Sequence, residues 1–222
     1  MKKYERPPDV SIIVPYRNRP NQLNTWEKLV GGRLQESAEI LIVEQTDDLP
    51  FNRGCLLNIG FRYSRGHRVI FHDVDLVPND DLLNQYCSPW PKSVVHFGSR
   101  FSRYNNTDRY FGGVTGFFRR DFPGFPNRFW GWGGEDDVLF NRTYSAIHRP
   151  RSGHYTDLEF LPTVKHKLNT LRRVDKCLNR WELKASDHCR TDNHVTIPES
   201  VRFAHRLHMK TSFRKIIHVL FY

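Results

Sequence analysis

Two aspartates with one residue between them, Asp73 and Asp75, closely follow the apolar run Val69–Phe71. Side chains two residues apart at the end of a strand point to the same side, so these carboxylates would repel each other. A hard divalent cation such as Mg²⁺ or Mn²⁺ relieves that repulsion and also takes substrate phosphates as ligands. The pair therefore predicts a clamp for a nucleoside diphosphate. A solvated acidic loop is the alternative interpretation of such a pair taken alone.

A second candidate is the segment 129–137, which combines two tryptophans, three glycines and three acids. Glycine lets the backbone approach a ligand closely, and the flat face of an indole packs on the C–H face of a sugar ring. Carboxylates accept hydrogen bonds from sugar hydroxyls, and one of them can act as a general base. The segment indicates a sugar-binding and catalytic loop; a turn with two buried tryptophans is the alternative.

Basic and aromatic residues form the remaining candidates. Arg17, Arg19 and Arg53 stand close to the expected ends of early elements, and the guanidinium group suits phosphate. Two glycines follow aromatic residues at 110–113, which is typical of a turn that lines a pocket or of an ordinary hairpin. His166 could complete a metal site begun by Asp75. For each arginine the alternative is a surface charge, and for His166 a surface or packing histidine.

The elements that must position these residues can be read from hydrophobic periodicity. Apolar runs predict strands at 10–14, 40–43, 69–71, 93–97 and 216–221, and helical spacing predicts helices over 23–30 and 52–64. The glycine pair at 31–32 is expected to end the first helix. Alternating strands and helices predict a parallel sheet covered on both faces, which binds ligands beyond the carboxyl ends of its strands.

Composition limits the class of protein. The 222 residues are 38% hydrophobic and 26% charged, which is typical of a folded chain, and no run is long enough to span a membrane. The net charge is +10, and most of the excess lies after residue 137. This asymmetry suggests an acidic partner such as an anionic glycan or a membrane surface, or else a solvated basic face. No zinc-finger or RNP pattern accompanies it, so nucleic acid is not favoured.

Five motifs stand in the order seen in the beta-1,4-galactosyltransferases, glycosyltransferase family 7, and the chain resembles that family over roughly residues 8–170. His72 and the segment 128–130 are more similar to the xylosylprotein branch than to the lactose-type branch. The motifs are Val14–Arg19, Phe51–Arg53 with Leu57–Phe61, His72–Leu76, Tyr110–Val114 and Arg128–Asp137.

This resemblance implies a single-domain α/β structure, the GT-A fold, which is a Rossmann-like doubly wound sheet. Residues 8–150 would form the nucleotide-sugar-binding and catalytic core, and residues 151–222 a C-terminal metal and acceptor segment packed on the same domain. The implied reaction is an inverting transfer of galactose from UDP-galactose to an acceptor sugar in a beta-1,4 linkage, with Mn²⁺ as cofactor.

The resemblance also implies roles for individual residues. Asp136 would be the general base, with Glu135 binding the acceptor and Trp132 touching both sugars. Asp75 and His166 would bind the metal, and the bulk of Tyr110 would favour galactose over N-acetylgalactosamine. The residues implied for the donor site are Pro15, Arg17, Arg19, Phe51, Arg53, Asp73, Val74, Tyr110, Gly113 and Trp132.

The chain departs from the family at one metal ligand. The lactose-type branch has a methionine three residues before the histidine, where this chain has Thr163, and the linker branch has a second histidine two residues after it, where this chain has Leu168. A water, a weaker site or another side chain would have to compensate. The four cysteines match neither a CxxC pattern nor the disulfides of the lactose-type branch, and Cys55 is expected to be a buried thiol.

Alternatives remain in two classes. A relative could use UDP-N-acetylgalactosamine or another UDP-sugar, or a non-catalytic relative could bind glycans or nucleotides without turnover. The expected partners are a UDP-sugar donor and a glycan or glycoconjugate acceptor, anionic or lipid-linked, with peripheral membrane contact. The N-terminus does not have the pattern of a signal peptide. The expected location is the cytoplasm for a complete chain, or the Golgi lumen if an N-terminal anchor precedes it.

Overall fold

The computed structural model describes residues 8–34, 36–102, 110–127, 129–131, 133–159, 203–209 and 214–221. Within these residues the main sheet has eight strands in the order β7-β5-β6-β3-β1-β2-β10-β9, and β4 and β8 form a separate pair. The strands are β1 Val10–Tyr16, β2 Ala38–Gln45, β3 Arg68–His72, β4 Leu76–Pro78, β5 Val94–Val95, β6 Val114–Phe118, β7 Ile147–His148, β8 Tyr155–Asp157, β9 Phe203–Met209 and β10 Arg214–Phe221.

The strand β1 marks the point where the order of the sheet reverses. It pairs in parallel with β2 on one side and with β3 on the other, and β10 extends the parallel part beyond β2. The strand β6 runs antiparallel to β3. In open α/β sheets, the crevice outside the carboxyl ends of two strands that diverge in this way is the usual ligand site. The segments that follow β1 and β3 carry Arg17, Arg19, Asp73 and Asp75.

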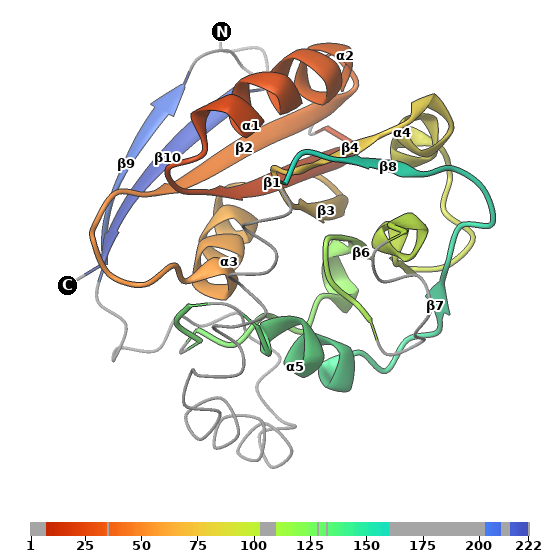
Figure 1. Cartoon of the computed structure of the whole chain (residues 1–222). Coiled ribbons are helices and arrows are strands. Elements are labelled where there is room, and N and C mark those ends of the chain that lie inside the picture. The colour runs from red at the N-terminus through yellow and green to blue at the C-terminus, as the bar shows by residue number, and fades with distance from the viewer. Residues whose placement is uncertain are drawn as a thin grey trace, which may run out of the picture.

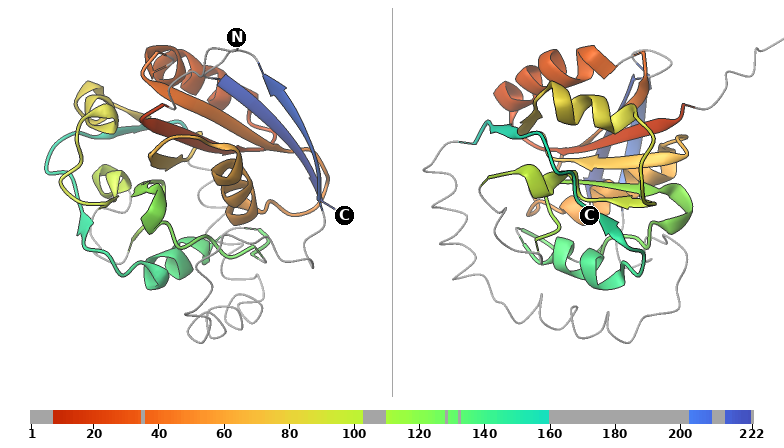
Figure 2. Two further views of the ribbon diagram at one scale, coloured as in Figure 1. Left: turned by 180° about the vertical axis from the view of Figure 1, so that it is seen from behind. Right: turned by 90° about the vertical axis from the view of Figure 1, so that its right-hand side faces the viewer.

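Helices cover both faces of the sheet (Figures 1 and 2). One face packs against α1 (Pro20–Trp26), α2 (Gly32–Leu34) and α4 (Asp80–Cys87). The other packs against α3 (Arg53–Tyr63) and α5 (Glu135–Arg142). Successive β1 side chains alternate between these two cores: Ile12 and Val14 belong to the first and Ile13 to the second. No described helix is long and apolar enough to cross a membrane.

Most of the predicted elements are confirmed, with two corrections. The first helix does not end at the glycine pair, because a π-helical turn over Glu27–Gly31 carries it on into α2 as far as Leu34. The strand predicted over 93–97 is only β5, since a 3₁₀ turn already begins at Phe97. Cys55 is buried in α3 as expected, and burial raises the pKa of its thiol to about 12.

The helix α3 packs very close to the sheet and is capped at its start. The side chain of Asn52 accepts a hydrogen bond from the backbone N–H of Cys55 at 3.0 Å, which satisfies one of the donors at the helix N-terminus. A Cβ atom added at Gly60 would lie 2.3 Å from Cγ2 of Ile13, so only glycine allows this approach. The position of α3 over β1 fixes where Arg53, its first residue, lies.

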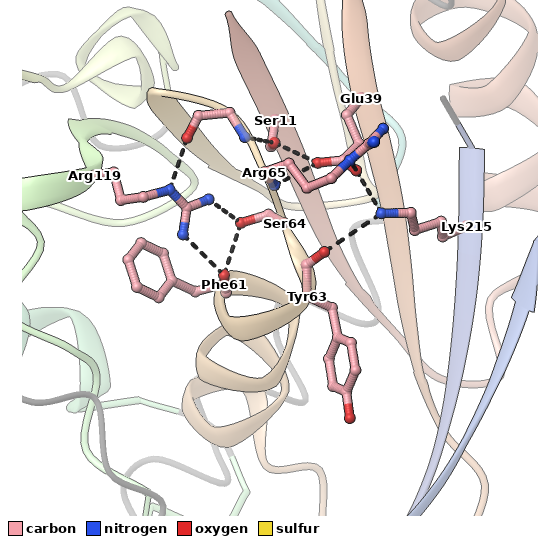
Figure 3. Close-up of polar contacts among 9 residues, drawn as sticks. Ser11, Glu39, Phe61, Tyr63, Ser64, Arg65, Arg119 and Lys215 are labelled. Carbon is pink, nitrogen blue, oxygen red and sulfur yellow. Dashed lines mark hydrogen bonds and ion pairs between the residues drawn. The ribbon is translucent and has the colours of Figure 1, made fainter. Parts of the chain in front are cut away.

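A buried ionic network ties the last strand to the second (Figure 3). Nζ of Lys215 in β10 lies 2.6 Å from Oε1 of Glu39 in β2, and Oε2 of Glu39 accepts from Ser11 Oγ at 2.7 Å and from the Arg65 backbone at 2.8 Å. Burial would raise the pKa of Glu39, but the hydrogen bonds from Lys215, Ser11 and Arg65 outweigh it and lower the pKa. The carboxylate therefore stays charged inside the sheet.

Candidate functional site

Backbone contacts bring the predicted site segments together at the carboxyl ends of β1 and β3. The N–H of Gly131 donates to the carbonyl of Phe51 at 2.9 Å, which joins the glycine- and tryptophan-rich segment to the start of α3. The N–H of Asp73 donates to the carbonyl of Gly113 at 3.0 Å, which joins the acidic segment to the residues before β6. These bonds join the four motifs in two pairs, and the ion pair of Arg53 with Asp73 brings the two pairs into one site.

Arg53 is the centre of a charged cluster in this site. Its Nε lies 2.8 Å from Oδ1 of Asp73, and its Nη1 lies 2.8 Å from Oδ1 of Asp136 and 3.5 Å from Oε1 of Glu135. The side chains of Arg53 and Glu135 are only 10% and 8% exposed, whereas that of Asp136 is 27% exposed. Arg53 was expected to line the donor site; in this structure it holds the acids of two motifs together.

The two acids at the start of α5 hold their protons more strongly than ordinary carboxyl groups. Burial raises the pKa of Asp136, and the charges of Glu135 and Asp73 add to the rise, although Arg53 opposes it. Burial raises the pKa of Glu135 as well, again against the attraction of Arg53. A carboxylate with a raised pKa accepts a proton more readily, which suits a general base.

The α5 helix begins where the glycines end. Gly131, Gly133 and Gly134 have φ angles of +90°, +100° and +97°, in the left-handed region where other residues are strained. Gly134 is the N-cap, and the first turn of α5 carries Glu135, Asp136 and Asp137. Negative charge is favourable at a helix N-terminus, so the glycine turn and the helix together place these acids at the site.

A second ion-pair cluster lies at the ends of β1 and β8. Arg19 Nη1 lies 2.9 Å from Oδ2 of Asp75, and Arg19 Nη2 lies 2.8 Å from Oε1 of Glu159. Sequence reasoning missed Glu159, because no motif surrounds it and only the pairing of β8 with β4 brings it here. Asp73 and Asp75 lie beyond the strand on which their expected alternation rested, because β3 ends at His72 and the chain turns; Asp73 pairs with Arg53 and Asp75 with Arg19.

The remaining donor-site candidates line the same edge of the sheet. The Arg17 guanidinium lies 5.5 Å from the centre of the Phe51 ring, and its Nη1 donates to the carbonyl of Leu49. Pro15 is buried within β1, and Val74 is buried between the two aspartates. Val74 belongs to the core on the α1 face of the sheet.

Tyr110 lies beside the catalytic candidate Asp136. Gly113 has a φ of +76°, and a Cβ atom added there would lie 2.8 Å from the Tyr110 hydroxyl. A Cβ atom added at Gly112 would lie 2.5 Å from Oδ2 of Asp136. The glycine pair thus leaves room for the aromatic ring and the carboxylate to approach the same short backbone segment.

Two predicted site residues, Trp132 and His166, cannot be placed in this way. Trp132, His166 and the departures at Thr163 and Leu168 lie outside the described residues. The neighbouring Trp130 packs on Phe221 of β10, with ring centroids 5.3 Å apart. In the described parts of the chain, no three side chains from His, Cys, Asp and Glu gather as a metal centre. The carboxylate of Asp75 is nevertheless a suitable ligand for a hard cation that takes its other ligands from a diphosphate.

Two family models match this sequence. Residues 4–88 match the N-terminal region of glycosyl transferase group 7, and residues 92–167 match the model described as the N-terminal domain of galactosyltransferase. The two matches follow each other along the chain and together include every predicted site residue. They support the family to which the motifs pointed.

Curated relatives agree with these models. Beta-1,4-galactosyltransferase 6 of Rattus norvegicus is 36% identical over 167 residues, which cover 67% of this chain and 43% of the relative. Beta-1,4-galactosyltransferase 1 of Homo sapiens is 37% identical over 196 residues, which cover 82% of this chain and 49% of the relative. The chain thus spans less than half the length of these relatives. Which branch it is most similar to stays a prediction.

Solved structures show the fold. The catalytic domain of Drosophila beta1,4galactosyltransferase 7, in a mutant complex with manganese, UDP-Gal and xylobiose, superposes with a TM-score of 0.72 at 23% identity, covering 96% of this chain and 94% of the other. Glucosyl-3-phosphoglycerate synthase from Mycobacterium tuberculosis superposes with a TM-score of 0.57 at 14% identity, covering 94% and 86%. The predicted GT-A fold is confirmed.

Proposed function

We propose a function for this chain from one premise, that it belongs to glycosyltransferase group 7, the family of the beta-1,4-galactosyltransferases. The proposed activity is an inverting transfer of galactose from UDP-galactose to a hydroxyl of an acceptor sugar in a beta-1,4 linkage. The observation that carries this proposal is the cluster in which Asp73, Glu135 and Asp136 meet on Arg53. It joins the expected donor-side and acceptor-side motifs in one place.

Asp136 is the general base of the proposed reaction. The acceptor hydroxyl must lose its proton as its oxygen attacks the anomeric carbon, and the sugar–phosphate bond breaks on the opposite face with its electron pair leaving on UDP. Asp136 has a raised pKa and a partly exposed carboxylate, so it can both reach the acceptor and take its proton. Glu135, more deeply buried, would hold the acceptor, and Trp132 would pack on the sugar rings.

The donor is proposed to bind at the ends of β1 and β3. Arg17 and Arg19 would hold the diphosphate, and Phe51, with Pro15, Val74 and Gly113, would shape the pocket for the nucleotide and sugar. Asp75 and His166 would hold Mn²⁺, which when bound supplies positive charge to the leaving diphosphate. Drosophila beta1,4galactosyltransferase 7 has been solved with manganese and UDP-Gal, which supports this assignment.

The test is UDP release from UDP-galactose with and without Mn²⁺, using GlcNAc, xylose and glucose as acceptors and a sulfated sugar as an anionic acceptor. We expect metal-dependent release that one acceptor stimulates. Asp136→Asn should lower kcat by about 10²- to 10⁴-fold, the range for a lost general base. Asp137→Asn, which neutralises the next acid of the same helix turn, is the matched control and should keep its activity.

The outcome also separates the alternatives. UDP binding without release from any donor would reject a transferase and favour a binding protein. Release in Asp136→Asn equal to that of the unchanged chain would reject Asp136 as the base but leave the transfer standing. Stimulation by the sulfated sugar that disappears at high salt would support an anionic acceptor for the basic C-terminal part.

The donor preference has its own test at Tyr110. A Cβ atom at Gly113 would lie 2.8 Å from its hydroxyl, and its ring centroid lies 5.4 Å from that of His96, so its bulk is held beside Gly113, whose carbonyl accepts from the Asp73 N–H. Tyr110→Leu should open the pocket and raise the use of UDP-N-acetylgalactosamine relative to UDP-galactose. An unchanged ratio of kcat/KM for the two donors would contradict the role of Tyr110 and reopen the identity of the donor.

A further inference from the structure

The Arg19 guanidinium bridges two carboxylates that come from distant parts of the chain. Asp75 stands directly before β4, and Glu159 stands two residues after β8. These strands pair, with Leu76 opposite Asp157, and the N–H of Leu158 donates to the carbonyl of Asp75 at 2.8 Å. Backbone pairing therefore brings Asp75 and Glu159 together, and the positively charged guanidinium of Arg19 lies between them.

Because the side chains of Asp75 and Glu159 are both largely buried, a cation is needed between them. The side chain of Glu159 is 3% exposed and that of Asp75 is 15% exposed. Two carboxylates removed from water in this way repel each other and lose hydration unless a cation compensates them. In this structure Arg19 supplies that positive charge, with its Nη1 2.9 Å from Oδ2 of Asp75 and its Nη2 2.8 Å from Oε1 of Glu159.

Arg19 has a second expected partner in the proposed reaction, namely the donor diphosphate. Both terminal nitrogens of its guanidinium already contact carboxylates, Nη1 that of Asp75 and Nη2 that of Glu159, so these two carboxylates compete with a diphosphate for Arg19. A divalent cation between these acids would compensate them with twice the charge of Arg19. It would also suit the donors available, since such ions use one or two carboxylates together with substrate phosphates.

We infer that Asp75 and Glu159 together bind the divalent cation, and that Arg19 holds this position until the cation arrives and then turns to the diphosphate. The inference rests on the proposed function. Glu159 would thus replace the metal ligand that this sequence lacks. Thr163 stands where the lactose-type branch has a methionine, and Leu168 where the linker branch has a second histidine. It also makes the two ligands in the described part of the site oxygen donors, which suit Mg²⁺ as well as Mn²⁺.

The experiment measures Mn²⁺ binding to the nucleotide-free chain by electron paramagnetic resonance of the free ion, followed by UDP binding at saturating Mn²⁺. Glu159→Gln, which keeps the shape and removes the charge, should weaken Mn²⁺ binding by about tenfold or more. Arg19→Gln should strengthen Mn²⁺ binding several-fold, because the competing cation is gone, and should weaken UDP binding. Asp80→Asn is the matched control, since Asp80 also pairs with an arginine, Arg33, but on the surface.

The outcomes distinguish this inference from the proposed function. If the unchanged chain binds Mn²⁺ and Glu159→Gln binds it equally, Glu159 is not a ligand and only the inference fails. If the unchanged chain binds no Mn²⁺ even with UDP, both the inference and the metal dependence of the proposed function fail. If Glu159→Gln does not fold, as judged by circular dichroism, Arg19→Gln decides: unchanged or weaker Mn²⁺ binding in that variant overturns the inference.

Discussion

Each acid of this site is held in place, and its charge compensated, by an arginine with which it forms an ion pair. Arg53 contacts Asp73, Glu135 and Asp136, and Arg19 contacts Asp75 and Glu159. Each guanidinium lowers the cost of keeping several carboxylates close together and partly buried. The chemistry expected of the acids, proton transfer at one cluster and cation binding at the other, therefore depends on residues that do not themselves react.

Arg53→Gln should shift the pH dependence of kcat/KM to higher pH. The positive charge of Arg53 favours the ionised form of Asp136, so its loss raises the pKa of that carboxyl further. The base works only when deprotonated, so the rate at neutral pH falls by about tenfold for each unit of the shift and partly recovers at alkaline pH. Steady-state rates between pH 6 and 9 measure this. An equal loss at every pH would mean that Arg53 acts only on donor binding; Arg62→Gln, on the exposed side of α3, is the control.

At the scale of elements, the site depends on pairings between distant strands. The pairing of β8 with β4 places Glu159, and the pairing of β10 with β2 places the last residues of the chain against the segment that carries Trp130. The network of Lys215 and Glu39 ties β10 to β2 through a charge that is almost completely removed from water. Removing one partner of such a pair leaves the other poorly compensated; without Lys215, Glu39 would be left with the more exposed Arg65, whose Nε lies 3.0 Å from its Oε1.

Lys215→Met should lower the free energy of unfolding by about 3 kcal/mol, because Glu39 would lose its closest cation while remaining buried. Adding Glu39→Gln should restore part of the loss, since the buried side chain at position 39 is then uncharged and no longer needs Lys215. Urea unfolding followed by circular dichroism measures both. Lys28→Met, at an exposed position, is the control. A double variant less stable than Lys215→Met would show that the loss comes from packing rather than charge.

At the scale of the whole molecule, two buried histidines make the fold sensitive to acid. His72 and His96 are 0% and 1% exposed, and burial lowers the pKa of each to about 4. Both are neutral in the folded chain and would take up protons on unfolding below the ordinary histidine pKa of about 6.5. Their contribution to stability is present above that value and is lost as the pH falls towards 4.

Lowering the pH from 7 to 5 should therefore reduce the free energy of unfolding by about 2 kcal/mol for each of these histidines. Urea unfolding at pH 7, 6 and 5 measures the loss. In His96→Gln the loss should be smaller, whatever the stability of that variant at pH 7. His67→Gln, at an exposed position, should show the full loss. Equal pH dependence in the unchanged chain and in His96→Gln would contradict the assignment.

The sequence by itself determined the family, the order of the main elements and the motifs of the site. Hydrophobic periodicity placed the strands that became β1, β2, β3 and β10, because core-facing positions must be apolar wherever they occur in a sheet. Asp75 and Asp136 were found because short motifs mark them. The division of the chain at residue 150, and the roles of the individual site residues, stay predictions.

Only the tertiary structure decided which charges meet. Glu159 has no surrounding motif. It reaches Arg19 because β8 pairs with β4, with Leu76 opposite Asp157, a residue 81 positions later in the sequence. Asp73 and Asp75 looked like one clamp in the sequence but bind different arginines, since the chain turns after His72. Local patterns reflect local preferences of the backbone, whereas an ion pair between distant segments is set by the packing of the whole sheet.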